Sequence, residues 1–314
     1  MNNTVLNYQL DQISTYSLPI IMAFTFISNI INIGVLCRRK LRLSPCTHYF
    51  LALSIATLIY SSVSPMNLFF SYCYGISLDA SPFGCKFLSF SIYLSALFVS
   101  LMLVCASIDR FIASSSSVHL RYLSKIQITR QLIVIISIAI IIYMSPFFII
   151  YHWNHSNNEC IQTSTAITII YFSSRILLYY IIAPLLMIVF GLLTIYNIRN
   201  QTQRVSPVNL FNSNRRTEGQ LARMLIIQVS VYVFFSIPAA VTYILTTFIP
   251  SMNTILITDI RIYTIIWQQG TYILSPFLYI LSANIYKQEL KKMFNMQYYH
   301  KQILDYITYL FQSN

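Results

Sequence analysis

Residues 85–110 read CKFLSFSIYLSALFVSLMLVCASIDR, a long segment of low charge. It begins with a cysteine, ends with the pair Asp109 and Arg110, and carries no charge between Lys86 and Asp109. As an α-helix its 25 steps would rise about 37 Å, more than the roughly 30 Å hydrocarbon core of a bilayer. We therefore expect a tilted membrane-spanning helix with a cysteine at one mouth and an acid–base pair at the other.

The composition supports a membrane protein. The 314 residues are 56% hydrophobic and only 9% charged, with a mean hydropathy of +0.64, whereas a soluble surface needs far more charge. The six cysteines are too few for a disulfide-rich scaffold. The net charge of +12 does not indicate a nucleic-acid partner, because the basic residues lie in short segments between apolar runs, where topology signals belong.

Apolar runs long enough to cross a lipid bilayer occur seven times. They cover residues 17–37, 47–72, 82–114, 128–151, 166–198, 217–248 and 255–281. The sequence therefore predicts an all-α membrane protein whose residues 17–281 form a seven-transmembrane helix bundle. Residues 1–16 would be a segment outside the first span, and an odd number of spans places the two termini on opposite sides.

The basic residues orient the bundle. They follow the first, third, fifth and seventh runs, as Arg38, Arg39, Lys40, Arg42, Arg121, Lys125, Arg130, Arg199, Arg204, Arg215, Arg216, Arg223, Lys287, Lys291, Lys292 and Lys301. The other side carries only Lys86, Arg175 and Arg261, against Asp11, Asp79, Glu159 and Asp259. Because positive charge marks the cytoplasmic side, we expect the amino terminus to be extracellular.

Two further signals bear on this topology. The acceptor sequences at Asn2 and Asn154 fall outside, where glycosylation is possible, although Asn200 matches the same pattern inside. Within residues 282–314, one helical face is apolar and the lysines lie mostly off it. Its apolar members are Tyr286, Leu290, Met293 and Phe294. This pattern predicts a short amphipathic helix on the inner leaflet, and the alternative is a solvated basic tail.

Seven runs of this polarity, with Cys85 and Arg110 standing 25 residues apart, resemble the rhodopsin-like (class A) G-protein-coupled receptors. Asp109, Arg110 and Phe111 are similar to that family's Asp-Arg-Tyr element, with Phe for Tyr. The resemblance implies a multi-pass plasma-membrane receptor that binds an extracellular ligand and activates a heterotrimeric G protein. It also implies a disulfide between Cys85 and Cys160, although Cys73 lies near the outer face and is a competing partner.

The resemblance assigns Arg110 a switching role. Glu218, 20 residues before Pro238, would bridge to Arg110 at the inner end and hold the third and sixth spans together until activation. The alternative is that Glu218 only offsets Arg215 and Arg216.

Prolines at family positions add to the resemblance, because proline bends a helix. Pro184, Pro238 and Pro276 match the prolines of the fifth, sixth and seventh spans. Ser275 to Tyr279 is similar to the family's Asn-Pro-x-x-Tyr element, with Ser for Asn, and Tyr279 would turn inward on activation.

The chain also departs from the family pattern. Asn29 fits the first-span asparagine, with Asn32 nearby on the same face, but the second span carries no acid. Ser236 occupies the tryptophan position of the sixth span, with Tyr232 or Phe235 as substitutes. These departures favour an alternative, a heptahelical protein that binds a ligand or partner, or acts as a scaffold, without coupling.

The ligand site should lie in the outer half of the bundle. The candidates are Ile92, Tyr93, Ala96, Arg175, Arg261, Gln268 and Gln269. Ile92 stands where amine receptors carry an acid, which argues against an amine because a buried ammonium needs a counter-ion. We expect a peptide with a neutral or acidic end that engages Arg175 or Arg261, unless both arginines only extend toward the outer headgroups.

Other classes fit less well. None of the eight acids is placed beside a second acid or a histidine at mid-membrane, and neither a metal-ligand spacing nor a glycine-rich phosphate loop is present. We expect no catalytic residue, metal or cofactor. A transporter would carry repeated halves and midplane charges, so it is the less favoured alternative.

Overall fold

The computed structural model describes residues 3–76, 78, 80–154, 159–163, 166–204, 212–249 and 255–294. The backbone alone is described at positions 3–14, 72, 159, 167, 201–204, 212–218, 221, 255, 256, 258 and 259. The long helices are α1 (Asn3–Leu36), α3 (Pro45–Tyr74), α4 (Pro82–Ala113), α6 (Ile126–Met144), α9 (Ala183–Arg204) and α10 (Asn212–Phe248). The shorter ones are α2 (Arg39–Arg42), α5 (Val118–Leu123), α7 (Phe147–Ile150), α8 (Ala166–Ile176), α11 (Ile255–Gln268), α12 (Gly270–Ser282) and α13 (Asn284–Phe294).

Six segments of the described chain are long and apolar enough to cross a membrane. They are Thr15–Leu36, Pro45–Ser71, Pro82–Ala113, Ile126–Ile150, Thr168–Asn200 and Ala222–Phe248. Each overlaps one of the first six predicted spans. The region predicted as the seventh span folds as α11 and α12, which meet at Gln269, and neither helix alone reaches the length of a span.

The surface and the interior show the distribution expected of a bundle in lipid. Large apolar side chains such as Ile142 and Leu281 are 66% and 81% exposed. Polar side chains such as Asn29, Asn32 and Gln228 are buried inside. Exposed single apolar residues are ordinary in soluble proteins, but a polar interior beneath an apolar exterior is not.

Helix α4, which contains residues 85–110, is the central element. It contacts α3, α5, α6, α7, α9 and α10. Both of its ends are anchored in the interior, since Cys85, Asp109 and Arg110 are all buried. It begins at an N-cap, where the Ser81 hydroxyl accepts a hydrogen bond of 2.9 Å from the amide of Gly84.

The fourth predicted span, residues 128–151, corresponds to the apolar segment Ile126–Ile150, but its helix is not continuous. It is interrupted after Met144, at Ser145 and Pro146, and Tyr151 begins strand β1 (Tyr151–Asn154) instead of ending a helix. Proline cannot donate the helical hydrogen bond, which explains the break. Strand β1 pairs antiparallel with β2 (Glu159–Gln162), with Trp153 opposite Cys160. The prediction of an all-α protein was therefore incomplete, because it missed this hairpin.

The fifth predicted span also contains a feature that the sequence did not reveal. A π-helical segment, η1 (Leu177–Ile182), separates α8 from α9 and lies directly before the turn that contains Pro184. Proline lacks the amide hydrogen and its ring crowds the preceding turn, so a wider turn accommodates it.

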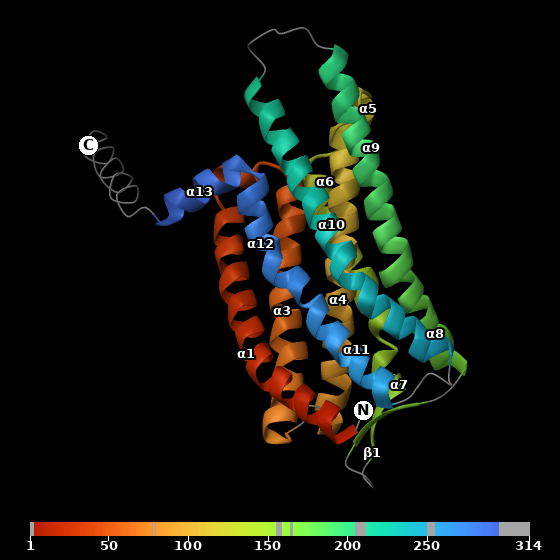
Figure 1. Cartoon of the computed structure of the whole chain (residues 1–314). Helices are drawn as coiled ribbons and strands as arrows, with labels where there is room; N and C mark the ends of the chain where they lie inside the picture. Colours follow the sequence, from red (N-terminus) through yellow and green to blue (C-terminus); the bar gives the residue numbers. More distant parts are fainter. Residues whose placement is uncertain are drawn as a thin grey trace, which may run out of the picture.

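The two ends of the bundle are distinct (Figure 1). The hairpin lies at the same end as the start of α1, and α13 lies across the opposite end. Helix α1 begins at Asn3, so residues 3–16 continue into the first apolar segment without a break in the helix. Asn2 lies outside the described residues.

Candidate functional site

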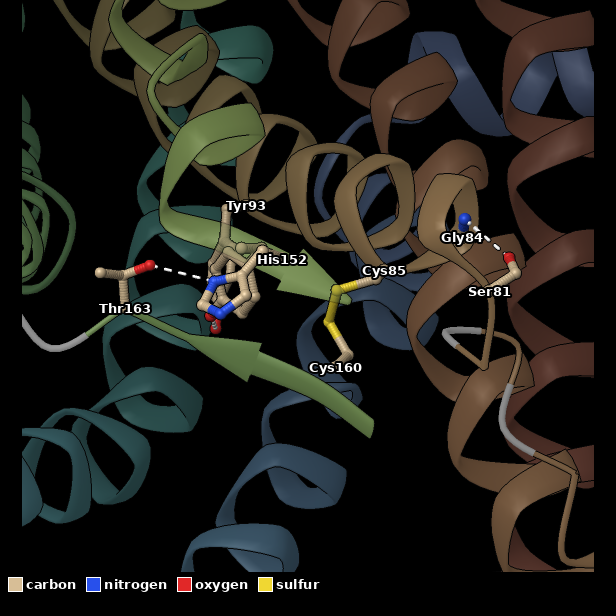
Figure 2. The surroundings of a disulfide bond; sticks show 8 residues. Ser81, Gly84, Cys85, Tyr93, His152, Cys160 and Thr163 are labelled. Carbon is tan, nitrogen blue, oxygen red and sulfur yellow. Dashed lines mark hydrogen bonds between the residues drawn. A yellow bond between two sulfur atoms is a disulfide. The ribbon is translucent and has the colours of Figure 1, made fainter. Parts of the chain in front are cut away.

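A disulfide fixes the hairpin to the bundle (Figure 2). Cys85 of α4 and Cys160 of β2 are bonded, with their Cα atoms 5.4 Å apart. This confirms the pairing that the family resemblance implied. Cys73, the competing candidate, is a free thiol that donates a 3.4 Å hydrogen bond to the Thr15 hydroxyl. The hairpin is thereby held over one end of α4.

Below the disulfide, Tyr93 of α4 lies in an aromatic cluster. Its ring stacks on Phe147 of α7 at 4.7 Å between centroids. Its hydroxyl lies 3.5 Å from the hydroxyl of Tyr151 on β1. Phe172 of α8 meets the Tyr93 ring edge-on at 6.2 Å. These rings form one wall of the candidate ligand site.

Arg175 of α8 lies against that wall. The central guanidinium carbon, Cζ, is 4.2 Å from the ring centre of Tyr93, 5.4 Å from that of Phe172 and 5.7 Å from that of Tyr243 in α10. The Arg175 side chain is only 6% exposed. It lies about two helical turns from the start of the apolar Thr168–Asn200 segment. We call Tyr93, Phe172, Arg175 and Tyr243 the arginine cage.

Aromatic rings alone do not compensate for the burial of this charge. Among the described side chains, neither Nε nor Nη2 of Arg175 has a hydrogen-bond partner. The cation–π contacts offset part of the cost of desolvating the charge, but a ring face does not replace the hydrogen-bond acceptors that the guanidinium N–H groups require. The arginine cage is therefore an electrostatically incomplete arrangement within the part of the chain described here.

Arg261 of α11 extends the positive region. Its Cζ atom lies 5.5 Å from the ring centre of Tyr243, so one tyrosine ring contacts both guanidinium groups. Its Nε atom is buried without a hydrogen-bond partner among the described residues. The hydroxyls of Thr242 and Thr264, 3.1 Å apart, join α10 to α11 beside it.

The other predicted ligand residues pack against apolar neighbours or form other hydrogen bonds. Ile92 and Ala96 pack against the apolar core. Gln268 donates a 2.9 Å hydrogen bond to the Tyr179 hydroxyl of η1, and Gln269 a 3.5 Å bond to the Tyr60 hydroxyl of α3. The structure thus brings Tyr93, Arg175 and Arg261 together and pairs the two glutamines with Tyr179 and Tyr60 instead.

A further hydrogen bond between buried polar side chains joins two helices of the bundle. Gln228 of α10 donates a 2.6 Å hydrogen bond to the Ser275 hydroxyl of α12. The Ser275 hydroxyl in turn donates to the Thr271 carbonyl at 2.7 Å. Sequence reasoning missed Gln228, because a lone glutamine in an apolar run carries no motif. The pair links the sixth predicted span directly to the Ser275–Pro276 element.

Close packing reinforces the same interface. A methyl group on Gly270 would overlap the Phe235 ring, so α10 and α12 approach there as only glycine permits. Phe235 also packs on Trp267 at 4.9 Å, whereas Tyr232 is fully buried beside Tyr179. Ser236 and Pro184 line an apolar cavity of about 220 Å³ between α9 and α10.

Helix α1 is tied to α12 and to α13. Asn29 donates to the Tyr272 carbonyl at 3.3 Å. Asn32 donates to the Ser54 hydroxyl at 2.7 Å and accepts a 2.8 Å bond from Tyr286. Burial raises the pKa of Tyr286 above its usual range, so its phenol stays protonated as the donor.

Tyr279 is fully buried between aromatic neighbours. Its ring lies 5.2 Å from Phe50 and 5.8 Å from Tyr286. Its hydroxyl has no hydrogen-bond partner within the described chain. The residue expected to turn inward on activation therefore already lies inside the bundle.

At the opposite end of α4, Arg110 is paired. Its Nη2 atom lies 2.7 Å from Oδ2 of Asp109, and the two side chains are 2% and 5% exposed. The Ser124 hydroxyl donates to Oδ1 of Asp109 at 2.7 Å. Phe111 packs on Phe190 of α9 at 5.6 Å. The carboxylate is thus held from both sides, by the guanidinium and by the hydroxyl.

The second predicted partner of Arg110 was Glu218. This residue lies in α10, but its side chain is outside the described set. The bridge between Arg110 and Glu218 therefore stays a prediction. No group of three or more His, Cys, Asp or Glu residues within the described chain is arranged to hold a metal ion.

The comparison with protein families decides the classification. The model of the 7 transmembrane receptor (rhodopsin family) matches residues 28–286, most of the chain. The chain belongs to this family. The resemblance drawn from Cys85, Arg110 and the prolines is thereby confirmed, and the protein is a multi-pass membrane receptor by family and by its apolar helices. A search of curated proteins gave no match to the chain.

Proposed function

We propose that this receptor lies in the plasma membrane, binds an extracellular ligand and activates a heterotrimeric G protein. The observation that carries the proposal is the buried Asp109–Arg110 pair, held by Ser124 at the end of the bundle away from the hairpin. A guanidinium released from this pair offers a planar set of five donors to a partner protein.

In the proposed topology, residues 255–281 form the seventh span and the amino terminus is extracellular. The hairpin then lies outside, where Asn154 is open to glycosylation, as is Asn2. Helix α13 would rest on the inner leaflet, where Lys287, Lys291 and Lys292 face anionic lipid headgroups. The disulfide supports this assignment, because disulfides form in the extracellular compartment.

Activation would move α10 relative to α4 and α12. Pro238 supplies the bend, and the Gln228–Ser275 bond and the Gly270–Phe235 contact define the interface that must rearrange. Asn29, Tyr232, Pro184, Pro276 and Tyr279 would adjust with it. Movement of a rigid helix is an established form of switching, and here it would open a cytoplasmic surface around Arg110.

A peptide is the proposed ligand type. The hairpin, held by its disulfide, borders the aromatic cluster around Tyr93 and offers backbone groups beside the candidate site. A peptide can meet both the hairpin and the deeper arginines in one extended contact.

The second candidate function is a heptahelical receptor that binds a ligand without coupling. The neutral second span favours it, because Ser54, Thr57 and Ser61 are buried there with no acid among them. Without an acid, the centre of the bundle lacks a charge to redistribute on ligand binding.

The two candidates are separated by a peptide-library screen with a promiscuous G-protein reporter. We expect an active peptide, loss of its signal in Arg110→Ala with peptide binding retained, and raised basal signal in Glu218→Ala. Retained coupling in Arg110→Ala would remove Arg110 from the mechanism. Failure of the wild-type receptor to couple with any peptide it binds would establish the second candidate.

A further inference from the structure

The arginine cage contains a buried cation for which the described chain supplies no counter-ion. Arg175 is 94% buried by its 6% exposure, and its Nε and Nη2 atoms lack hydrogen-bond partners among the described residues. Charged side chains at membrane depth are costly and as a rule serve a function. A purely structural role would be filled better by an apolar side chain of similar volume.

The surroundings of Arg175 indicate which chemical group could pair with its guanidinium. Tyr93, Phe172 and Tyr243 present ring faces and edges around the guanidinium, so a group entering there meets an apolar wall. The unsatisfied guanidinium atoms are donors only, so they require an acceptor. An anionic acceptor neutralises the charge as well as accepting its hydrogens, and a carboxylate matches the planar fork of arginine.

Arg261 provides a second cation that an anionic ligand could contact. It shares the Tyr243 ring with Arg175, with its Cζ atom 5.5 Å from the ring centre, and its buried Nε atom also lacks a partner in the described chain. Arg261 is less buried than Arg175, so an anion entering from outside would meet it first and then reach the deeper guanidinium.

We propose that the arginine cage is the binding site for a carboxylate of the ligand, with an aromatic or apolar group beside that carboxylate. Arg175 forms the charge-assisted pair and Arg261 attracts the anion to it. The inference rests on the proposed receptor function, because it names the chemical class of that receptor's ligand. The carboxylate can belong to a peptide carboxyl terminus or to a small organic acid.

The test compares acids with neutral analogues that have the same shape. The purified full-length receptor in lipid nanodiscs is titrated with hydrocinnamate and with hydrocinnamamide, and binding is read from the shift in melting temperature. In a second arm, acetyl-Phe-Phe with a free carboxyl terminus is compared with its carboxamide. We expect each acid to bind more tightly than its amide, and the arm with the larger difference identifies the source of the carboxylate.

Arg175→Met should weaken binding of the acids about 100-fold, to the level of the amides. Arg261→Met should weaken it less. Lys86→Met is the matched control, since it removes a cation beside Cys85 at the same end of α4 and should leave the preference for acids unchanged.

Equal binding of acid and amide would overturn the proposal. So would a preference for acids that survives in Arg175→Met, or no stabilisation by either acid up to its solubility limit. Binding is read here without a G protein, so these outcomes reject the carboxylate site and leave coupling untouched. Loss of coupling with normal acid binding would reject the proposed function and leave the carboxylate site standing.

Discussion

The two ends of the bundle each bury an arginine, and they treat it differently. Arg110 at the C-terminal end of α4 is 2% exposed and bonded to Asp109, whose other oxygen accepts from Ser124. Arg175 near the hairpin is 6% exposed and surrounded by aromatic rings, with two nitrogens unpaired among the described side chains. The paired charge can hold a resting arrangement, and we propose that a bound ligand completes the other one.

The largest expected effect comes from leaving Arg110 without a carboxylate partner, as Arg175 is among the described side chains. Asp109→Asn removes the carboxylate but keeps its shape, so Arg110 becomes a buried cation without its partner acid. Breaking a buried pair in this way costs about 3 to 5 kcal/mol, and we expect a lower melting temperature and raised basal G-protein activation. An unchanged melting temperature would mean that the pair does not hold the resting state. Ser124→Ala, which removes one hydrogen bond from the same carboxylate, should have a smaller effect in the same direction.

The second effect concerns the disulfide that holds the hairpin beside the arginine cage. Cys85→Ser releases the hairpin from α4, and the disulfide closes a separation of 75 residues. The loop-closure argument gives a loss of about 4 kcal/mol, measured as thermal unfolding in nanodiscs. Cys73→Ser is the matched control, because that cysteine is free. Equal loss in both variants would contradict a specific role for the hairpin.

A third effect tests the close contact between α10 and α12 at Gly270 and Phe235. Gly270→Ala forces a methyl group into the Phe235 ring, and overpacking of this kind costs about 1 to 3 kcal/mol. Gly191→Ala is the control, because nothing lies within 4 Å of the added methyl group there. Replacing Phe235 with Leu in the Gly270→Ala background should restore part of the lost stability. No restoration would show that the ring is not the source of the strain.

The smallest effect comes from the hydrogen bond between Gln228 and Ser275. Gln228→Leu and Ser275→Ala should each destabilise the receptor by about 1 kcal/mol and raise basal signalling. Because both remove the same bond, the double variant should lose less than the sum of the single ones. Strict additivity in the melting temperatures would mean that the bond does not couple α10 to α12.

The sequence predicts the two ends of α4 better than what lies between them. The charge-free length of residues 85–110, bounded by a cysteine and an acid–base pair, is a local pattern, and it was enough to predict the central helix. Six of the predicted spans overlap apolar helices for the same reason, since length and hydropathy are local properties. The disulfide needed the family resemblance, because spacing alone left Cys73 open.

Other features depend on packing between distant segments. The hairpin escaped prediction because each strand has only four residues and the first begins at the end of an apolar run. Arg175 was a candidate, but Phe172 and Tyr243 were not, because a ring becomes a cation partner only when helices bring it there. Gln268 and Gln269 were predicted as ligand residues from their depth, yet they bond to Tyr179 and Tyr60. Depth in a helix does not determine which neighbour a side chain meets.

The most direct test of the contrast between the two arginines is the melting temperature of the unliganded receptor carrying Arg175→Met or Arg110→Met. We expect Arg175→Met to stabilise the receptor by roughly 1 to 4 kcal/mol, because it replaces an unpaired buried charge with an apolar side chain of similar length. We expect Arg110→Met to destabilise it, because Asp109 is then left buried without its cation. A lower melting temperature in both variants would contradict the account, since it would make Arg175 a structural residue like Arg110.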